Sequence, residues 1–349
     1  MKVAVLFGGR SGEHEVSLVS GASVAGALAK RHEVVPILID HAGQWHLQRS
    51  PSPEGGEPVF LIASPEDRGA LRRLSDASVV VRPDVYFPVL HGTFGEDGTI
   101  QGLFELAAVP CVGSGTAASA AAMDKELMKA LFAAAGVPQT PYRVLRGRDD
   151  PARDAAIEAL GLPVFVKPAN LGSSVGVSKV KTMADLPRAL DLAFAYDRKV
   201  VVEAAVKANR ELEVSVLGNE DPQASVPGEI VPDREFYDYD SKYSPASRTE
   251  LRIPAPLDEA TTAVVRRLGV AAFRAVDACG YARVDFLLDR ARGAVLVNEI
   301  NTIPGFTSIS MFPKLWAASG IPYPELLARL VDLAVARHDE RARLRTTYR

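Results

Sequence analysis

The chain has 349 residues, 47% of them hydrophobic and 24% charged, and a formal net charge of −3 at pH 7, the composition of a globular protein of two or three domains. The balanced charge argues against a nucleic-acid-binding surface, which needs clustered Lys and Arg, and the two widely separated cysteines indicate neither a disulfide framework nor a zinc site. The N-terminal apolar run is too short for a signal peptide and no stretch approaches the roughly 20 apolar residues of a membrane span, so we expect a cytoplasmic protein with no membrane partner.

The first residues predict a strand, a glycine-rich loop, a helix and a second strand, over residues 3–7, 8–12, 17–30 and 34–39. This order favours an α/β fold with an open, mainly parallel sheet, in which ligands bind at the carboxyl ends of the strands. The glycine loop is not GxGxxG, so the dinucleotide fingerprint is absent. Glu13 follows the loop, where a ligand could be met, although acidic residues at a helix start are also ordinary capping chemistry.

Another buried strand, residues 84–90, ends in His91, and a glycine-rich polar segment, a helix over 99–108 and a strand over 109–112 follow. A histidine at the end of a strand is a weak signal for a site and equally suits a loop anchor. The alanine-rich residues 117–135 then predict one or two helices, with Asp124 as an internal cap. A domain boundary is expected near residue 118, and Lys125 is either a solvated helix residue or a phosphate ligand.

A strand over residues 162–167 ends in Lys167, and a Gly/Ser-rich segment, 168–177, leads into a further strand over 178–180. This strand–loop–strand is not a Walker A motif. It nevertheless has the parts of a phosphate cover, namely small residues, free N–H donors, the hydroxyls of Ser173 and Ser174, and a lysine. An ordinary hairpin turn is the alternative, but the loop is longer than a tight turn requires.

A helix over 185–196 precedes a strand over 199–202 that ends at Glu203, and a strand over 211–217 carries Glu211, Glu213 and Ser215 on one face. The polar loop 231–252 is longer than ordinary connections, and its aromatic residues favour a lid over a substrate rather than a disordered linker. A helix over 257–279 and a final helix over 322–342 flank the last feature.

That feature is a β-hairpin over residues 281–305, with an assumed loop from Arg290 to Ala294. Directly opposed carboxylates lie roughly 5 Å apart and repel, so a cation is expected between two of them. Carboxylate and amide oxygens suit Mg²⁺ that bridges substrate phosphates, whereas a solvated acidic surface is the simpler alternative. The predicted pairs are Asp289 with Val295, Asp285 with Glu299, and Arg283 with Asn301.

Taken together, these motifs resemble the D-alanine–D-alanine ligases of the ATP-grasp superfamily over nearly the whole chain. The motifs are GGRSGEHEVSL (8–18), LHGTFGEDGTIQGLFE (90–105), MDK (123–125), VKPANLGSSVGVSKV (166–180), FYDYDSKY (236–243), RVDF (283–286) and NEINTIPGFTSISM (298–311). The resemblance implies three α/β domains, over residues 1–118, 119–203 and 204–349, with ATP held between two of them. It also implies D-alanine and ATP as substrates, an acyl phosphate intermediate, a role in peptidoglycan precursor synthesis, and a homodimer.

The resemblance also implies roles for individual residues, each by its match to a family motif. The metal ligands, for two Mg²⁺ or Mn²⁺ ions, are Asp285, Glu299 and Asn301. The ATP-binding residues are Lys125, Lys167, Ser173, Ser174, Glu203, Glu211 and the lid residue Lys242. The residues that bind the amino-acid substrates are Glu13, His91, Tyr243, Arg283 and Ser310, and the catalytic group comprises Glu13, Ser173, Tyr243, Arg283 and the Gly305 amide. In the family, the residue matched by Glu13 is linked through Ser173 to Tyr243.

Three readings of the function stay open at this point. Tyr243 favours the dipeptide product, because relatives that make D-alanyl-D-lactate tend to replace this tyrosine. A D-alanine–D-lactate ligase or another ATP-grasp carboxylate–amine ligase is the same-class alternative. A nucleotide-binding protein without turnover is the different-class alternative, against which the intact set of charged site residues argues.

Overall fold

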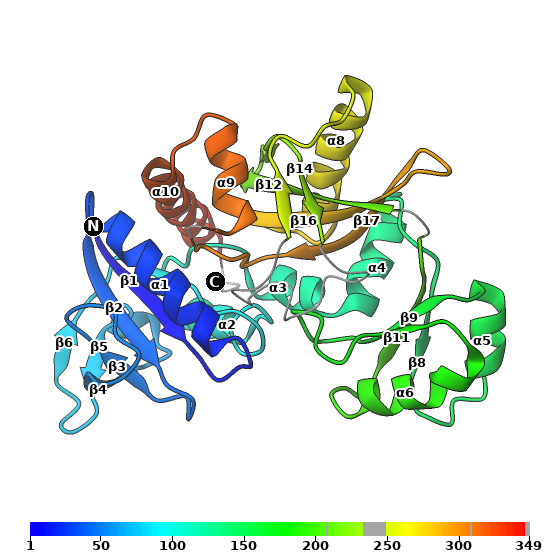
Figure 1. The fold of residues 1–349 in the computed structure, drawn as a ribbon. Helices are drawn as coiled ribbons and strands as arrows, with labels where there is room; N and C mark the ends of the chain where they lie inside the picture. The colour runs from blue at the N-terminus through cyan, green and yellow to red at the C-terminus, as the bar shows by residue number, and fades with distance from the viewer. Residues whose placement is uncertain (207–208, 233–248, 308, 346–349) are drawn as a thin grey trace.

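The computed structural model describes residues 1–206, 209–232, 249–307 and 309–345, which form three β-sheets with helices packed on them (Figure 1). The strands are β1 (Lys2–Gly8), β2 (Glu33–Ile39), β3 (Trp45–Leu47), β4 (Glu57–Leu61), β5 (Leu71–Arg73), β6 (Val79–Val81), β7 (Val85–Pro88), β8 (Tyr142–Leu145), β9 (Val164–Pro168), β10 (Ser178–Val180), β11 (Val200–Ala204), β12 (Asn209–Gly218), β13 (Gln223–Ala224), β14 (Gly228–Val231), β15 (Glu250–Arg252), β16 (Gly280–Asp289) and β17 (Ala294–Asn301).

The α-helices are α1 (His14–Leu28), α2 (Thr99–Leu106), α3 (Thr116–Met123), α4 (Lys125–Ala134), α5 (Arg153–Leu160), α6 (Leu186–Phe194), α8 (Glu259–Ala275), α9 (Met311–Ala318) and α10 (Tyr323–Ala342). Short 3₁₀ turns lie at Pro65–Asp67 and Met183–Asp185. Among the described residues, none of the helices combines the length and apolar character needed to cross a bilayer.

The N-terminal sheet has the strand order β6-β5-β4-β3-β2-β1-β7. Its parallel part is β2-β1-β7, as the apolar run of residues 3–7 predicts, because a strand covered on both faces needs apolar residues throughout. Strands β3 to β6 extend the sheet by antiparallel pairing, so the sheet is mixed rather than mainly parallel as expected. They escape sequence analysis because three of them are only three residues long and half exposed.

The second sheet, β10-β9-β11-β8, is antiparallel and carries α5 and α6. The third sheet, β15-β14-β12-β16-β17 with β13 at its side, is also antiparallel and carries α8. The predicted strand–loop–strand around the Gly/Ser-rich segment is therefore confirmed as the β9–β10 hairpin, and the C-terminal hairpin as β16–β17.

Side-chain packing crosses the proposed domain boundaries at two places. Ala122, Met128 and Phe132 of α3 and α4 belong to the core of the third sheet, together with residues of α8. Leu326 and Leu330 of α10 pack into the N-terminal core beside strands β1 and β7. The residue ranges of the three domains stay a prediction, but α4 is held against the third sheet while its first residue faces the second.

Three predicted elements differ from those observed. The predicted polar loop over 231–252 is wrong at both ends, because Val231 ends β14 and Glu250–Arg252 form β15, which pairs with β14; residues 233–248 lie outside the described part of the chain. The first helix begins at His14 rather than near residue 17, because the glycine loop turns the chain within fewer residues than expected. The predicted strand over 109–112 is wrong, since only an isolated bridge joins Tyr86 to Cys111. Pro110 lacks an N–H donor and Gly113 has φ +101°, so a regular ladder cannot extend in either direction.

Candidate active site

A cavity of about 690 Å³ lies where the three sheets meet. Every predicted site residue within the described part of the chain lines this cavity, which we call the cleft. Lys242 and Tyr243 lie outside the described residues. The lining residues from the prediction are Glu13, His91, Lys125, Lys167, Ser173, Ser174, Glu203, Glu211, Arg283, Asp285, Glu299, Asn301, Gly305 and Ser310.

Three neighbouring strands carry a row of carboxylates across the floor of the cleft. Asp285 on β16 lies opposite Glu299 on β17, as predicted, and opposite Glu213 on β12. Directly opposed residues of an antiparallel pair point to the same face, so all three carboxylates share one side of the sheet. Sequence analysis assigned Glu213 to a polar strand face without a role, because strand order is not visible in one sequence.

Arg283 neutralises part of this row. Its Nε and a terminal nitrogen each donate to Asp285 at 2.7 Å, and Nε lies 3.2 Å from Glu213. Burial alone would lower the pKa of the guanidinium, but Asp285 and Glu213 outweigh burial and raise this pKa well above its ordinary value. The cation that the opposed carboxylates require is therefore supplied in part by the protein itself.

The predicted register of the hairpin is confirmed at one end and wrong at the other. Arg283 faces Asn301 and Asp285 faces Glu299, but Asp289 pairs with Ala294 rather than with Val295. A β-bulge next to Asp285 causes the difference, because Phe286 pairs with Val297 and leaves Asn298 without an opposite residue. Bulges redirect side chains beside active sites, which fits this position next to the carboxylate row.

The oxygen atoms at this end of the hairpin fit a hard divalent cation. Two carboxylates and an amide oxygen form a donor set that suits Mg²⁺ or Mn²⁺. Asn301 Oδ1 accepts from the Ile303 N–H at 2.9 Å, which orients the amide. The Asp285 oxygens that accept from Arg283 each keep a further lone pair, so the ion pair leaves room for coordination.

Lys125 and Lys167, the two predicted phosphate-binding lysines, lie across the cleft from the carboxylate row and come from different units of the fold. Lys125 is the first residue of α4, where Asp124 caps the helix by accepting from the Glu126 and Leu127 N–H groups at 3.0 and 3.3 Å. The Lys125 ammonium donates to the Leu171 carbonyl at 2.5 Å, and burial lowers its pKa. The predicted internal cap at Asp124 is confirmed.

Lys167 is the last residue but one of β9 and donates to Glu203 at 2.5 Å, and Lys129 donates to the other oxygen of this carboxylate at the same distance. Burial would raise the pKa of Glu203, but the two ammonium groups outweigh burial and lower it strongly. Thr140 also donates to Glu203. Lys129 was missed, although its spacing of four residues from Lys125 on a helix already indicates a shared face.

The loop between β9 and β10 adopts a backbone suited to close ligand approach. Ser173 and Ser174 have φ of +50° and +61°, values that cost strain in residues other than glycine and that cluster at ligand clamps. At Gly176, with φ +72°, a Cβ atom would lie 2.7 Å from the Pro168 ring, so only glycine fits. The Ser173 hydroxyl donates to Glu13, which joins this loop to the N-terminal unit.

Glu13 and its neighbours form the end of the cleft on the N-terminal side. Glu13 precedes α1 but makes no side-chain capping hydrogen bond, so the capping alternative is not what the structure shows. His91 is buried: its Nδ1 donates to the Ile303 carbonyl at 3.0 Å, and its Nε2 lies 3.0 Å from the Ser20 hydroxyl. Burial lowers the pKa of His91, so the ring is neutral at neutral pH.

Glu96 is a further cleft residue that sequence analysis quoted within a motif but did not single out. It accepts from the Gly92 N–H at 2.7 Å. Burial and the charge of Glu13 raise its pKa well above the ordinary value. The raised pKa favours the neutral form of Glu96, so this end of the cleft carries less negative charge than its residues suggest.

Gly305 and Ser310 line the cleft from the segment between β17 and α9. A Cβ atom on Gly305 would lie 2.7 Å from the Ser310 Oγ, so glycine permits a close approach of the two segments. Ser310 Oγ accepts from the Thr307 N–H at 3.1 Å and lies 2.7 Å from the Thr307 hydroxyl. These groups stand at the start of α9, where backbone N–H groups favour an anion.

Comparison with known families accounts for most of the chain. The family model described as D-ala D-ala ligase N-terminus matches residues 2–114, and the one described as D-ala D-ala ligase C-terminus matches residues 131–332. A solved D-alanine-D-alanine ligase from Coxiella burnetii is 36% identical, covers 98% of this chain and 96% of its own, and has a TM-score of 0.85. The VanG D-Ala:D-Ser ligase from Enterococcus faecalis is 32% identical over 95% of this chain and 99% of its own, with a TM-score of 0.86.

Curated relatives are more similar still in sequence. A D-alanine–D-alanine ligase from Heliobacterium modesticaldum is 54% identical over 98% of this chain and 96% of its own length. D-alanine–D-alanine ligase A from Bradyrhizobium diazoefficiens is 48% identical over the whole of this chain and 98% of its own. Matches of this extent, over a fold that agrees throughout, show that the chain belongs to the D-alanine–D-alanine ligase family.

Proposed function

We propose that this protein joins two D-alanines to D-alanyl-D-alanine with ATP as co-substrate, releasing ADP and phosphate, for peptidoglycan precursor synthesis in the cytoplasm. The observation that carries the proposal is the shared cleft. One cavity brings together buried lysines for phosphate, a carboxylate row for a metal, and a substrate-side carboxylate, Glu13. A family member that had lost turnover would be expected to have lost part of this set.

In the first step, a carboxylate oxygen of one D-alanine attacks the γ-phosphorus of ATP, the bond from this phosphorus to the ADP oxygen breaks, and D-alanyl phosphate forms. Such a transfer depends on positioning and charge neutralisation. Lys125 and Lys167 neutralise phosphate oxygens, the Ser173–Ser174 loop covers them, and Glu13 holds the ammonium of the first D-alanine. Glu203 and Glu211 face adenosine, and the lid residue Lys242 is proposed from sequence alone.

In the second step, the amine of another D-alanine attacks the acyl carbon, and the resulting tetrahedral intermediate expels phosphate and loses a proton. Arg283 and the Gly305 N–H donate to the developing oxyanion, and Ser310 anchors the carboxylate of the second D-alanine. A preformed donor of this kind contributes most where water is excluded. The Arg283 guanidinium is a preformed donor, because Asp285 and Glu213 already hold it in place.

We propose Asp285, Glu299 and Asn301 as ligands of one or two Mg²⁺ or Mn²⁺ ions. When bound, the metal would offset the negative charge of the nucleotide phosphates. Lys125 and Lys167 lie on the second-sheet side of the cleft, and the proposed metal ligands lie on the third sheet. The phosphates would therefore have positive charge on two sides. We also propose a homodimer, which light scattering of the purified protein would test.

The experiment that tests the function measures ATP-dependent phosphate release with Mg²⁺ and D-alanine, with L-alanine as the control, and identifies products by mass. D-Alanyl-D-alanine from D-alanine only is the expected result. Added excess D-lactate or D-serine then tests the second substrate. A mixed product in place of the dipeptide would keep the mechanism and change the ligase class, whereas no phosphate release with any of them would contradict the proposal.

Glu13→Gln should raise the KM for D-alanine at the first subsite about tenfold or more, because an ammonium loses a charged partner that contributes about 1.5–3 kcal/mol. The KM for ATP should stay within about twofold, because the glutamine oxygen can still accept from Ser173 in the loop that covers the phosphates. Glu15→Gln is the matched control: it removes the same charge from the same end of α1, and although Glu15 also borders the cleft, its side chain is 78% exposed. Equal effects in the two variants would show that helix-end charge, not substrate contact, is responsible.

A further inference from the structure

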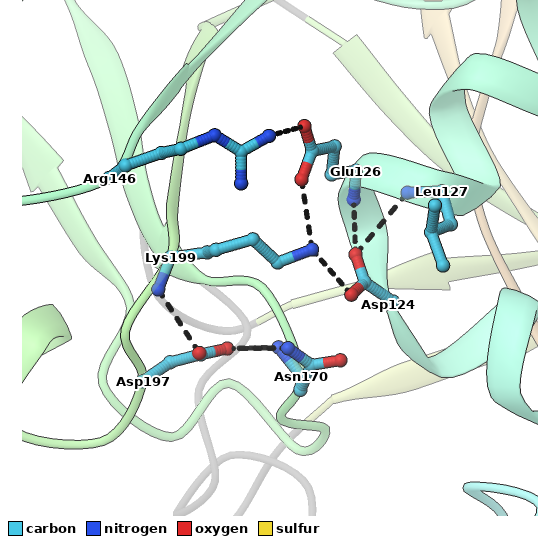
Figure 2. Close-up of polar contacts among 7 residues, drawn as sticks. All are labelled: Asp124, Glu126, Leu127, Arg146, Asn170, Asp197 and Lys199. Atoms are coloured by element: carbon cyan, nitrogen blue, oxygen red, sulfur yellow. Dashed lines mark hydrogen bonds and ion pairs between the residues drawn. The ribbon is translucent and has the colours of Figure 1, made fainter.

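Lys199 lies outside the cleft, just before β11, yet it is only 4% exposed. Its ammonium donates to Asp124 at 2.5 Å and to Glu126 at 2.9 Å, both at the start of α4 (Figure 2). Burial alone would lower the pKa of Lys199, but these carboxylates outweigh burial and raise it. The buried Lys199 therefore stays charged, and its ammonium is hydrogen-bonded to the first turn of α4, the helix that begins with Lys125.

The backbone of Lys199 contacts the loop between β9 and β10, which is the other proposed phosphate-binding element and which we call the phosphate loop. Its carbonyl accepts from the Ala169 N–H at 3.1 Å, and the Ala169 carbonyl accepts from the Lys125 N–H at 2.9 Å. The Lys199 N–H donates to Asp197 at 3.1 Å. Asp197 in turn accepts from both the backbone N–H and the side-chain amide of Asn170 at 2.8 Å, at the root of the phosphate loop (Figure 2).

Lys199 thus joins two units that pack separately. The first turn of α4 leads into residues buried in the core of the third sheet, whereas Lys199 and the root of the phosphate loop belong to the second sheet. A buried ion pair adds little net stability because desolvation offsets its attraction. Its value here is geometric, since ammonium, N–H and carbonyl of one residue fix the helix and the loop to each other.

We propose that Lys199 is a positioning residue for nucleotide binding: it sets the distance between Lys125 and the phosphate loop, which together hold the phosphates of ATP. The residue touches no substrate and acts only through Asp124, Asp197 and Ala169. This inference rests on the proposed use of ATP. Direct binding of ADP is therefore the readout, because it requires neither ligation nor a correct assignment of the amino-acid substrates.

The test compares four variants by calorimetric titration with ADP and by steady-state kinetics. Lys199→Met should weaken ADP binding and raise the KM for ATP about 10- to 100-fold, the order of loss that a shift of ~1 Å in a binding group produces. The KM for D-alanine should stay unchanged. Lys199→Arg should recover most of the affinity, because a guanidinium can donate to both carboxylates.

The remaining variants separate positioning from stability. Arg146→Met removes the other cation on Glu126, which contacts it at 2.5 Å from a side chain that is 59% exposed, and should leave ADP affinity unchanged. Lys199→Met with Asp124→Asn leaves no unpaired carboxylate at Asp124 and keeps an oxygen to cap α4, so it should fold even where the single variant is unstable. Unchanged ADP affinity in this folded double variant overturns the proposal, as does an equal loss in Arg146→Met. Absent ligase activity with the expected ADP pattern would instead contradict the proposed function alone.

Discussion

Asp285→Asn and Glu299→Gln should each lower the rate of ligation by about 10³-fold while leaving the fold intact. Both changes keep side-chain volume and remove one negative charge from the carboxylate row. A metal that loses a carboxylate ligand binds more weakly and neutralises less phosphate charge, an effect worth several kcal/mol. Phosphate release at saturating ATP and D-alanine measures the loss, and titration of Mn²⁺ by magnetic resonance reports metal binding directly.

The two variants should not behave alike in every respect. Asp285→Asn also removes the partner that Arg283 holds at 2.7 Å through two nitrogens, so it should lower thermal stability more than Glu299→Gln does. Glu250→Gln is the control, because its carboxylate also pairs with an arginine of the third sheet, Arg252 at 2.9 Å, but lies outside the cleft. Near-normal turnover in both cleft variants would remove the metal assignment.

Arg283→Met should lower kcat about 10²- to 10³-fold, the loss seen when one donor to a developing oxyanion is removed, about 3–4 kcal/mol. The same change leaves Asp285 and Glu213 adjacent without their shared cation, so the melting temperature should also fall. Arg283→Lys should restore part of the stability and little of the rate, because an ammonium cannot reproduce the planar two-nitrogen contact.

Arg210→Met is a close control for this arginine. Arg210 makes a two-nitrogen pair with Glu229 at 2.5 and 2.8 Å within the same sheet, and its side chain is 16% exposed against 18% for Arg283. Both methionine variants should lose stability, but only Arg283→Met should lose kcat. A proportional loss of rate in the two would assign the Arg283 effect to general destabilisation.

Local patterns led to much of the fold. The apolar run at residues 3–7, the cap at Asp124 and the β9–β10 hairpin each depend on a few neighbouring residues, so each could be recognised from the chain itself. The pair Asp285–Glu299 also followed from the alternation of one hairpin. Its far end did not, because a bulge is a response to packing and leaves no regular sequence signal.

The groups that complete the site depend on contacts between distant segments. Ser173 meets Glu13 across the N-terminal and second sheets, Glu203 receives Lys129 from a helix packed on the third sheet, and Glu213 joins the carboxylate row only because β12 neighbours β16. Spacing alone gives none of these pairs, and only the link from Ser173 to Glu13 was implied by the family resemblance. Charged residues alone do not specify which opposite charge will lie beside them once the chain is compact.

The sequence by itself therefore determined the family, through seven motifs in the order of one ligase family, and it predicted lysines and small residues for phosphate and carboxylates and an amide for a metal. Only the tertiary structure decided how these parts are held: by the carboxylate row, by the two lysines that donate to Glu203 and by the hydrogen bonds of Lys199. The physical reason is the distance along the chain over which each property is set. Residue types and their alternation can be read from neighbouring positions, whereas burial, pKa and pairing arise when separate sheets pack and exclude water between them.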